Sequence, residues 1–181
     1  FDDIYVGYRY FETLPAARDK VNYPFGFGLS YTTFQWEALS CAVAEDMVVC
    51  TVAVRNTGSR PGKQVLQLYF SAPQGKLGKP ALELGAYAKT RLLAPGQQEG
   101  LTLTMPVGDM ASYDDLGKVC KSAWVLEQGD YHIYIGTDVR QVRQVLSYGL
   151  EEDVVAEQLH EHLKPHKLEK RMLSDGSFEP L

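Results

Sequence analysis

Long apolar runs and a surplus of basic residues are both absent from this sequence. No apolar run approaches the ~18 residues that a membrane-spanning helix needs. The net charge is -5, which provides no electrostatic footprint for nucleic acid or for an anionic membrane. We therefore expect neither a membrane nor a nucleic acid among the partners of this protein.

Cysteine is scarce, and no C-x-x-C pair occurs. The sequence contains three cysteines, Cys41, Cys50 and Cys120. Because three is an odd number, at least one thiol is free of an internal bridge. Cys50 lies in an alternating apolar run and is interpreted as a small core residue. This cysteine usage favours a cytosolic setting. The sequence opens directly on Phe-Asp-Asp-Ile (residues 1–4) without a signal-peptide pattern, and we expect the chain to begin inside a larger protein.

The middle of the chain carries repeated β-strand signals. Its 181 residues, 45% of them apolar, suffice for one domain with a real core plus extra segments. Val48, Cys50, Val52 and Val54 alternate with their neighbours at a period of two. Further strands are expected at residues 65–70, 83–93, 100–106, 123–127, 130–136 and 141–148. About seven short strands separated by turn signals predict an antiparallel β-sandwich.

The two ends of the chain differ from this middle part. Ile4, Val6 and Tyr8 alternate like a strand, whose sheet would lie upstream, and residues 14–23 are interpreted as a loop. After Glu151, apolar residues recur at a spacing of four, which predicts a helix that Pro165 ends. The apolar positions of that helix are Val155, Leu159 and Leu163.

Residues 22–34 read Asn-Tyr-Pro-Phe-Gly-Phe-Gly-Leu-Ser-Tyr-Thr-Thr-Phe, which is typical of a tight turn. Gly26 and Gly28 alternate with large aromatic residues that would hold the turn by burial. The segment resembles the Pro-Phe-Gly-Tyr-Gly-Leu-Ser-Tyr-Thr-Thr-Phe signature of the family 3 glycoside hydrolases, the β-glucosidase family. Phe27 stands where that family usually has Tyr. Residues 3–13, 56–69 and 92–96 resemble other segments of the family in the same order.

The resemblance implies a domain organisation. Residues 1–33 would end an α/β sandwich domain, and residues 34–148 would form a fibronectin type III-like, immunoglobulin-like antiparallel β-sandwich. Residues 149–181 would form a helical linker, leading to a following barrel domain in members whose domain order is permuted.

The implied function is that of a non-catalytic structural domain in a retaining β-glucosidase-like enzyme. The parent enzyme would hydrolyse terminal β-D-glucosyl or related β-glycosyl bonds. Its remaining sandwich and barrel domains would be the partners of this chain, a homodimer interface is a further option, and no cofactor is implied. The β-glucoside would meet this chain only through the parent enzyme.

No catalytic residue is predicted within the chain. A retaining glycosidase needs two carboxyl groups about 5 Å apart. The resemblance places the nucleophilic Asp in the barrel and the acid/base Glu upstream of residue 3, and neither motif occurs here. The acidic clusters at residues 2–3, 45–46, 114–115 and 151–153 are typical of solvated turns and element ends. The chain alone should therefore be inactive.

Histidines and aromatic residues are the other ligand candidates. A zinc site needs three or four convergent ligands, and the spacing of His160, His162 and His166 does not supply them on one helix face, so no metal is predicted. Tyr10 and Phe11 are candidates for the rim of the parent enzyme's substrate pocket. The other aromatic residues near the N-terminus are expected to pack against the missing sheet of the α/β sandwich domain. The aromatic residues on the strands of the β-sandwich are expected to pack in its core; these are Trp36, Tyr69, Tyr87, Trp124 and Tyr134.

Two other functions remain open. A carbohydrate-binding module would need several aromatic side chains exposed together on one face. An adhesion or scaffold module would have no use for the turn signature at residues 22–34.

Overall fold

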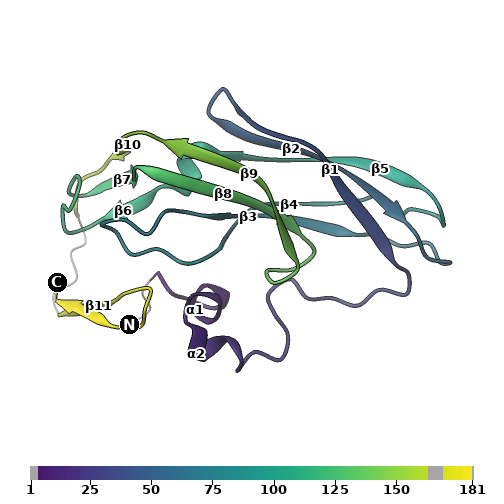
Figure 1. The fold of residues 1–181 in the computed structure, drawn as a ribbon, viewed down its shortest axis with the longest axis horizontal. Helices are drawn as coiled ribbons and strands as arrows, with labels where there is room; N and C mark the ends of the chain where they lie inside the picture. Colours follow the sequence, from purple (N-terminus) through teal and green to yellow (C-terminus); the bar gives the residue numbers. More distant parts are fainter. Residues whose placement is uncertain (1–3, 163–168, 181) are drawn as a thin grey trace.

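The computed structural model describes residues 4–162 and 169–180 and is almost entirely β-structure (Figure 1). Its helical elements are α1 (Tyr8–Thr13), α2 (Pro15–Arg18) and the 3-10 turn η1 (Val107–Met110). Its strands are β1 (Phe34–Ala44), β2 (Met47–Asn56), β3 (Val65–Ser71), β4 (Glu83–Lys89), β5 (Gln98–Pro106), β6 (Ser112–Asp114), β7 (Ala123–Leu126), β8 (Gly129–Gly136), β9 (Val142–Leu150), β10 (Val154–Gln158), β11 (Lys170–Met172) and β12 (Phe178–Pro180). The expected all-β fold class is confirmed.

Two antiparallel sheets form the sandwich. One has the strand order β1-β2-β5, and the other has the order β4-β3-β8-β9. The period-two pattern of β2 is confirmed, because Val48, Cys50, Val52 and Val54 are all fully buried. They pack against side chains of the opposite sheet such as Leu68, and the resulting core is the main apolar cluster of the described residues. Burial of this cluster is the principal driving force for folding.

Cys50 is part of that core, as expected, but it is not a free thiol. It lies directly opposite Cys41 in the β1–β2 register, and the two form a disulfide with a Cα–Cα distance of 4.1 Å. Cys120 keeps its free thiol.

The expected helix after residue 151 is wrong where the structure describes it. Val154 and Val155 lie on β10, which pairs with the edge of β7. β-branched residues favour strands, and an open strand edge offers hydrogen-bonding groups that a helix would leave unpaired. Leu163 and Pro165, which the helix prediction also used, lie outside the described residues.

The N-terminal segment (residues 4–33) also differs from expectation, because no strand forms where Ile4, Val6 and Tyr8 alternate, and helix α1 begins at Tyr8. The helix turns two i, i+4 pairs, Tyr8/Glu12 and Arg9/Thr13, toward the β-sandwich. The Glu12 carboxylate accepts a hydrogen bond from Arg140 Nε (2.9 Å), and Thr13 Oγ1 accepts one from the backbone N–H of Ala81 (2.8 Å). A strand would have pointed half of these side chains away. Residues 15–18, expected as loop, form the single turn α2.

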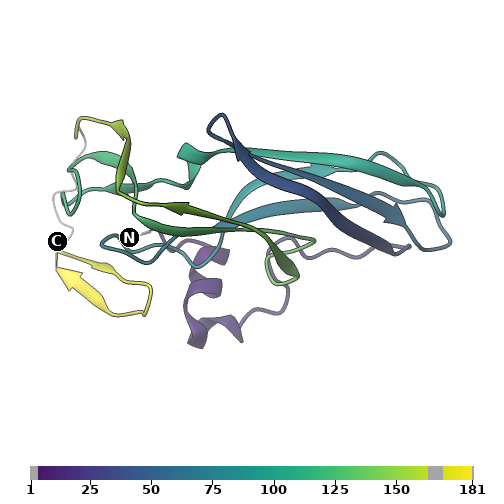
Figure 2. The ribbon, with the colours of Figure 1, turned by 45° about the horizontal axis from the view of Figure 1, so that its top comes forward.

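As a result, α1 and the following turn cover the outer face of the β4-β3-β8-β9 sheet (Figures 1 and 2). Tyr8 stacks on Phe25, with ring centroids 4.4 Å apart, and meets the ring of Tyr69 edge-on at 6.4 Å. Tyr69 is fully buried although it points out of the sandwich core. Burial raises the pKa of its hydroxyl, which donates a hydrogen bond to Gln67 Oε1.

The predicted turn at residues 22–34 depends on one of its two glycines. Gly26 has a φ of 85°, a left-handed conformation that favours glycine, whereas Gly28 has no positive φ. The turn is fastened to the sandwich by Asn56, which is fully buried at the end of β2. Its Oδ1 accepts a hydrogen bond from Thr32 Oγ1 (2.8 Å), and its Nδ2 donates to the carbonyl oxygens of Arg60 (2.7 Å) and Leu93 (2.8 Å).

We predict that the sandwich folds without residues 1–33. The main core cluster is built from residues 34–150 only, which is what an autonomous domain requires. Deletion exposes the ring of Tyr69 and removes the Arg140–Glu12 ion pair, so the free energy of unfolding should fall by about 2 kcal/mol. Thermal unfolding followed by circular dichroism should still show one cooperative transition. A molten product without a transition would show that the N-terminal segment belongs to the core.

Candidate functional site

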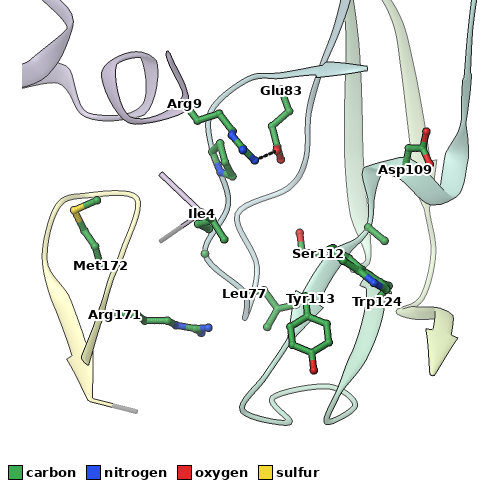
Figure 3. A pocket seen from close by; sticks show the side chains of 13 residues that line it. Ile4, Arg9, Leu77, Glu83, Asp109, Ser112, Tyr113, Trp124, Arg171 and Met172 are labelled. Carbon is green, nitrogen blue, oxygen red and sulfur yellow. Dashed lines mark hydrogen bonds and ion pairs between the residues drawn. The ribbon is translucent and has the colours of Figure 1, made fainter. Parts of the chain in front are cut away.

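A pocket of about 270 Å³ lies where four distant parts of the sequence meet (Figure 3). We call it the β6–β7 pocket. Its walls come from the N-terminal segment, the β3–β4 loop, the β5–β7 region and β11. The lining residues are Ile4, Arg9, Leu77, Gly78, Pro80, Glu83, Asp109, Ala111, Ser112, Tyr113, Trp124, Arg171 and Met172.

Two aromatic rings stand exposed at this pocket. Tyr113 on β6 and Trp124 on β7 are register partners, with ring centroids 5.6 Å apart and planes tilted by 59°. Their exposed fractions are 36% and 40%, so the expectation that Trp124 packs in the core is wrong. The neighbours Ala123 and Val125 are fully buried, and a period-two pattern places Trp124 on the opposite face. Tyr87 on β4, also expected in the core, is 72% exposed elsewhere on the surface.

Charged groups of both signs line the same pocket. Arg9 Nη1 donates a hydrogen bond to Glu83 Oε2 across 3.1 Å. Burial raises the pKa of Glu83, and the Arg9 guanidinium opposes that rise. Arg171 extends from β11 toward the side of the pocket that holds Leu77 and Tyr113 (Figure 3). The pocket thus offers both donors and acceptors beside two aromatic rings.

Arg171 is held by two carboxylates but is not fully satisfied. Its Nη1 donates to Asp115 Oδ1 (2.8 Å) and its Nε to Glu179 Oε1 (2.5 Å). Its Nη2 is buried and finds no hydrogen-bond partner in the part of the chain that the structure describes. A buried donor without an acceptor costs roughly 1–3 kcal/mol. The hairpin of β11 and β12 therefore brings an incompletely paired guanidinium to the pocket.

A buried ion pair fixes the β3–β4 loop, which contributes Leu77 to the lining of the pocket. Lys79 and Glu127 form a salt bridge with side chains only 1% and 3% exposed. Glu127 also accepts hydrogen bonds from the backbone N–H groups of Lys76 (2.6 Å) and Leu77 (3.1 Å). Lys79 Nζ donates in addition to the carbonyl oxygen of Pro73 (2.7 Å). This network holds the β3–β4 loop, and with it Leu77, in one geometry.

A second buried carboxylate fixes the turn between β6 and β7. Asp114 is fully buried, and its two oxygens accept hydrogen bonds from four successive backbone N–H groups, those of residues 117–120 (2.7–3.1 Å). Burial alone would raise the pKa of Asp114, but these four bonds outweigh it and hold the pKa below its ordinary value. In the cluster at residues 114–115, expected as a solvated turn, Asp114 is therefore a buried structural residue, whereas the side chain of Asp115 is 36% exposed.

The rim candidates Tyr10 and Phe11 lie elsewhere. Their rings meet edge-on at 5.3 Å, and both are half-buried on α1. Phe11 lines a hollow of about 400 Å³ together with Tyr8, Tyr23 and Phe25, whereas Tyr10 is not among its lining residues in the described chain. Nothing in this arrangement tests their expected role at a substrate pocket, which stays a prediction.

The remaining candidates are not brought together. His160 and His162 have ring centroids 6.4 Å apart, and His166 lies outside the described residues. Within residues 4–162 and 169–180, no three His, Cys, Asp or Glu side chains are placed to hold a metal ion. The same residues include no helix long and apolar enough to cross a membrane. The pair Glu45 and Asp46 forms the β1–β2 turn with positive φ angles of 51° and 59°.

Sequence reasoning missed most of the β6–β7 pocket. The alternation around Trp124 carried a usable signal, and the Asp114-Asp-Leu-Gly117 string is a turn signal that accounts for the backbone bonds of Asp114. No local pattern could indicate Arg171, because the hairpin that carries it returns from more than 40 residues away in sequence.

Comparison with known proteins identifies this architecture. A fibronectin type III-like domain matches residues 64–139. The chain is 54% identical to β-glucosidase A of Butyrivibrio fibrisolvens over 99% of its length, and 45% identical to a β-glucosidase of Ruminococcus albus over 95%. It spans only 24% and 18% of those two proteins.

Solved structures agree with these matches. A β-glucosidase from Paenibacillus barengoltzii superposes with a TM-score of 0.91 at 46% identity, covering 98% of this chain and 21% of that one. β-Glucosidase 3B from Thermotoga neapolitana, solved with glucose, gives a TM-score of 0.73 at 39% identity, covering 86% of this chain and 20% of that one. The chain is therefore a fibronectin type III-like domain, with its flanking segments, of the family 3 glycoside hydrolases.

Proposed function

We propose that this chain is a supporting, non-catalytic domain of a retaining β-glucosidase-like enzyme, and that the N-terminal segment is its contact with the catalytic domains. The observation that carries the proposal is an exposed apolar face on that segment. This aromatic face consists of Tyr23, Phe25, Phe27, Leu29 and Tyr31, which are 72%, 42%, 42%, 92% and 99% exposed.

Several large apolar side chains exposed on one short segment indicate an interaction surface. The inner side of the same segment is already fixed to the sandwich, since the Phe25 carbonyl accepts a hydrogen bond from the Val139 N–H (3.0 Å). The outer side is therefore rigidly presented to a partner. The relatives extend far beyond the part that this chain matches, so most of each relative is available to supply that partner.

The enzymatic part of the proposal rests on the relatives. They are β-glucosidases, and the parent of this chain would hydrolyse terminal β-glucosyl or related bonds with carboxylates outside it. A homodimer through the same face is a second use of the surface, and it is distinguished by the experiment below.

The test replaces Phe25 and Phe27 with Ser. In the isolated chain, we expect the aromatic face to drive self-association, which sedimentation velocity should show falling in the double variant. In the parent enzyme, the same change should lower the midpoint of thermal unfolding. The KM for an aryl β-glucoside should stay within about twofold of the parent value, because the replaced side chains make no contact with the substrate.

Leu39→Ser is the matched control. Leu39 is 60% exposed on β1 and is not part of the aromatic face, so its replacement should alter neither association nor the midpoint. Unchanged stability of the parent with a large rise in KM would place the rings in the substrate pocket and reject the supporting role. Loss of a parent dimer in the double variant, with the midpoint of the monomer unchanged, would favour the homodimer interface.

A further inference from the structure

We propose that the β6–β7 pocket is a binding site for a neutral saccharide and accommodates one pyranose ring. The inference does not depend on the supporting role of the domain. It rests on the composition, the charge and the rigidity of the pocket described above.

The lining combines the two kinds of surface that a sugar ring presents. A pyranose has an apolar face of C–H groups and an edge of hydroxyl groups. The partly exposed rings of Tyr113 and Trp124 supply walls for the face. Ser112, Arg9 and Glu83 supply donors and acceptors for the edge, and all of them line the same pocket.

The charges of the pocket give no preference for an anion. Its lining holds two arginines, Arg9 and Arg171, and two carboxylates, Glu83 and Asp109. Arg9 is paired with Glu83, and Arg171 is paired with Asp115 and Glu179, so neither cation is free to select an anion. The unpaired Nη2 of Arg171 still needs an acceptor, which a hydroxyl can supply without bringing charge.

The walls are held in place before any ligand binds. Lys79 and Glu127 fix the loop that carries Leu77, and Asp114 fixes the turn beside Tyr113. The β11–β12 hairpin is tied to that turn through Lys118 and Glu179 (2.8 Å). A rigid site loses little entropy on binding. The volume of about 270 Å³ lies near the lower end of small-molecule sites, roughly 300–1,000 Å³, which suits a single ring.

The full chain offers its own internal control, because it contains only two tryptophans. Trp124 lines the pocket, whereas Trp36 on β1 lies under the Arg143 guanidinium, 3.9 Å from its ring centroid. We expect methyl β-D-glucopyranoside and cellobiose to shift the indole N–H resonance of Trp124 and not that of Trp36, with a Kd of about 1 mM.

Variants of the aromatic walls test the site. Trp124→Ala and Tyr113→Ala should each weaken binding by about tenfold, and Trp124→Phe should recover part of the loss. Tyr87→Ala is the control, because it removes an exposed tyrosine ring that does not line the pocket, and it should leave the Kd for the sugar unchanged. Thermal midpoints within about 2 °C of the parent chain would show that the variants are folded.

Three results would overturn the proposal. The first is the absence of any Trp124 shift with either sugar at concentrations well above the expected Kd. The second is sugar binding that is equally strong in Trp124→Ala. The third is stronger binding of sulfate, or of cyclohexanol, than of methyl β-D-glucopyranoside, which would make the pocket an anion site or a plain apolar site.

Discussion

Replacing Lys79 with Met should destabilise the domain by about 3–5 kcal/mol, because it leaves the Glu127 carboxylate buried without its cation. Glu127→Gln should cost a similar amount, since it uncouples the buried Lys79 ammonium and weakens the acceptors for the Lys76 and Leu77 N–H groups. Chemical denaturation at neutral pH, analysed by linear extrapolation, measures both.

The adjacent exposed pair supplies the control. Lys76 Nζ lies 2.8 Å from Asp153 Oδ2, with side chains 57% and 25% exposed, so Lys76→Met should destabilise the domain far less than Lys79→Met. The combined change Lys79→Met with Glu127→Leu removes both buried charges and should recover much of the loss. A single variant as stable as the parent chain would contradict the buried, paired state of this network.

Asp114→Asn should be the next most damaging single change, by about 3 kcal/mol at neutral pH. The amide has one oxygen in place of two, so it cannot accept all four backbone N–H groups of residues 117–120, and buried donors are left unpaired. Because the turn also carries Asp115, the partner of Arg171, the variant should further loosen the β11–β12 hairpin. Amide hydrogen exchange at residues 117–120 reports that local effect.

The pH dependence follows from the lowered pKa of Asp114. A carboxylate whose pKa is lower in the folded state binds fewer protons than the unfolded chain, so its contribution is present above the unfolded pKa of about 3.9 and is lost below it. The stability gap between the parent chain and Asp114→Asn should therefore narrow as the pH falls below about 4. Asp153→Asn serves as the comparison, because the pKa of the Asp153 carboxyl is lowered mainly by its hydrogen bond with the exposed Lys76 side chain. A gap that stays constant into acid would mean that the pKa of Asp114 is the same in the folded and the unfolded chain.

Much of the sandwich could be predicted from local patterns. The alternation through Val48 and Val54 required one buried face, and each strand expected between residues 65 and 148 appears with similar bounds. Strands leave this trace because successive side chains point to opposite sides, so burial on one side is recorded at every second residue. The turn signature at residues 22–34 also carried enough information to indicate the family.

The flanking segments were not determined in this way. A short apolar alternation such as Ile4–Tyr8, or a spacing of four such as Val155–Leu159, is compatible with more than one backbone conformation. α1 forms because a helix directs Tyr8 and Glu12 together onto the outer face of the sheet, and β10 forms because β7 offers an unpaired edge. Such choices belong to contacts between distant segments, which outweigh weak local preferences.

The β6–β7 pocket shows the same division most clearly. The sequence by itself determined an all-β domain of the β-glucosidase family and the alternation that turns Trp124 away from the core. Only the tertiary structure decided that Trp124 lines one pocket together with Tyr113, Arg9 and Arg171. The physical reason is that side-chain direction along a strand is a local property, whereas the meeting of segments more than 100 residues apart depends on sheet pairing and buried ion pairs.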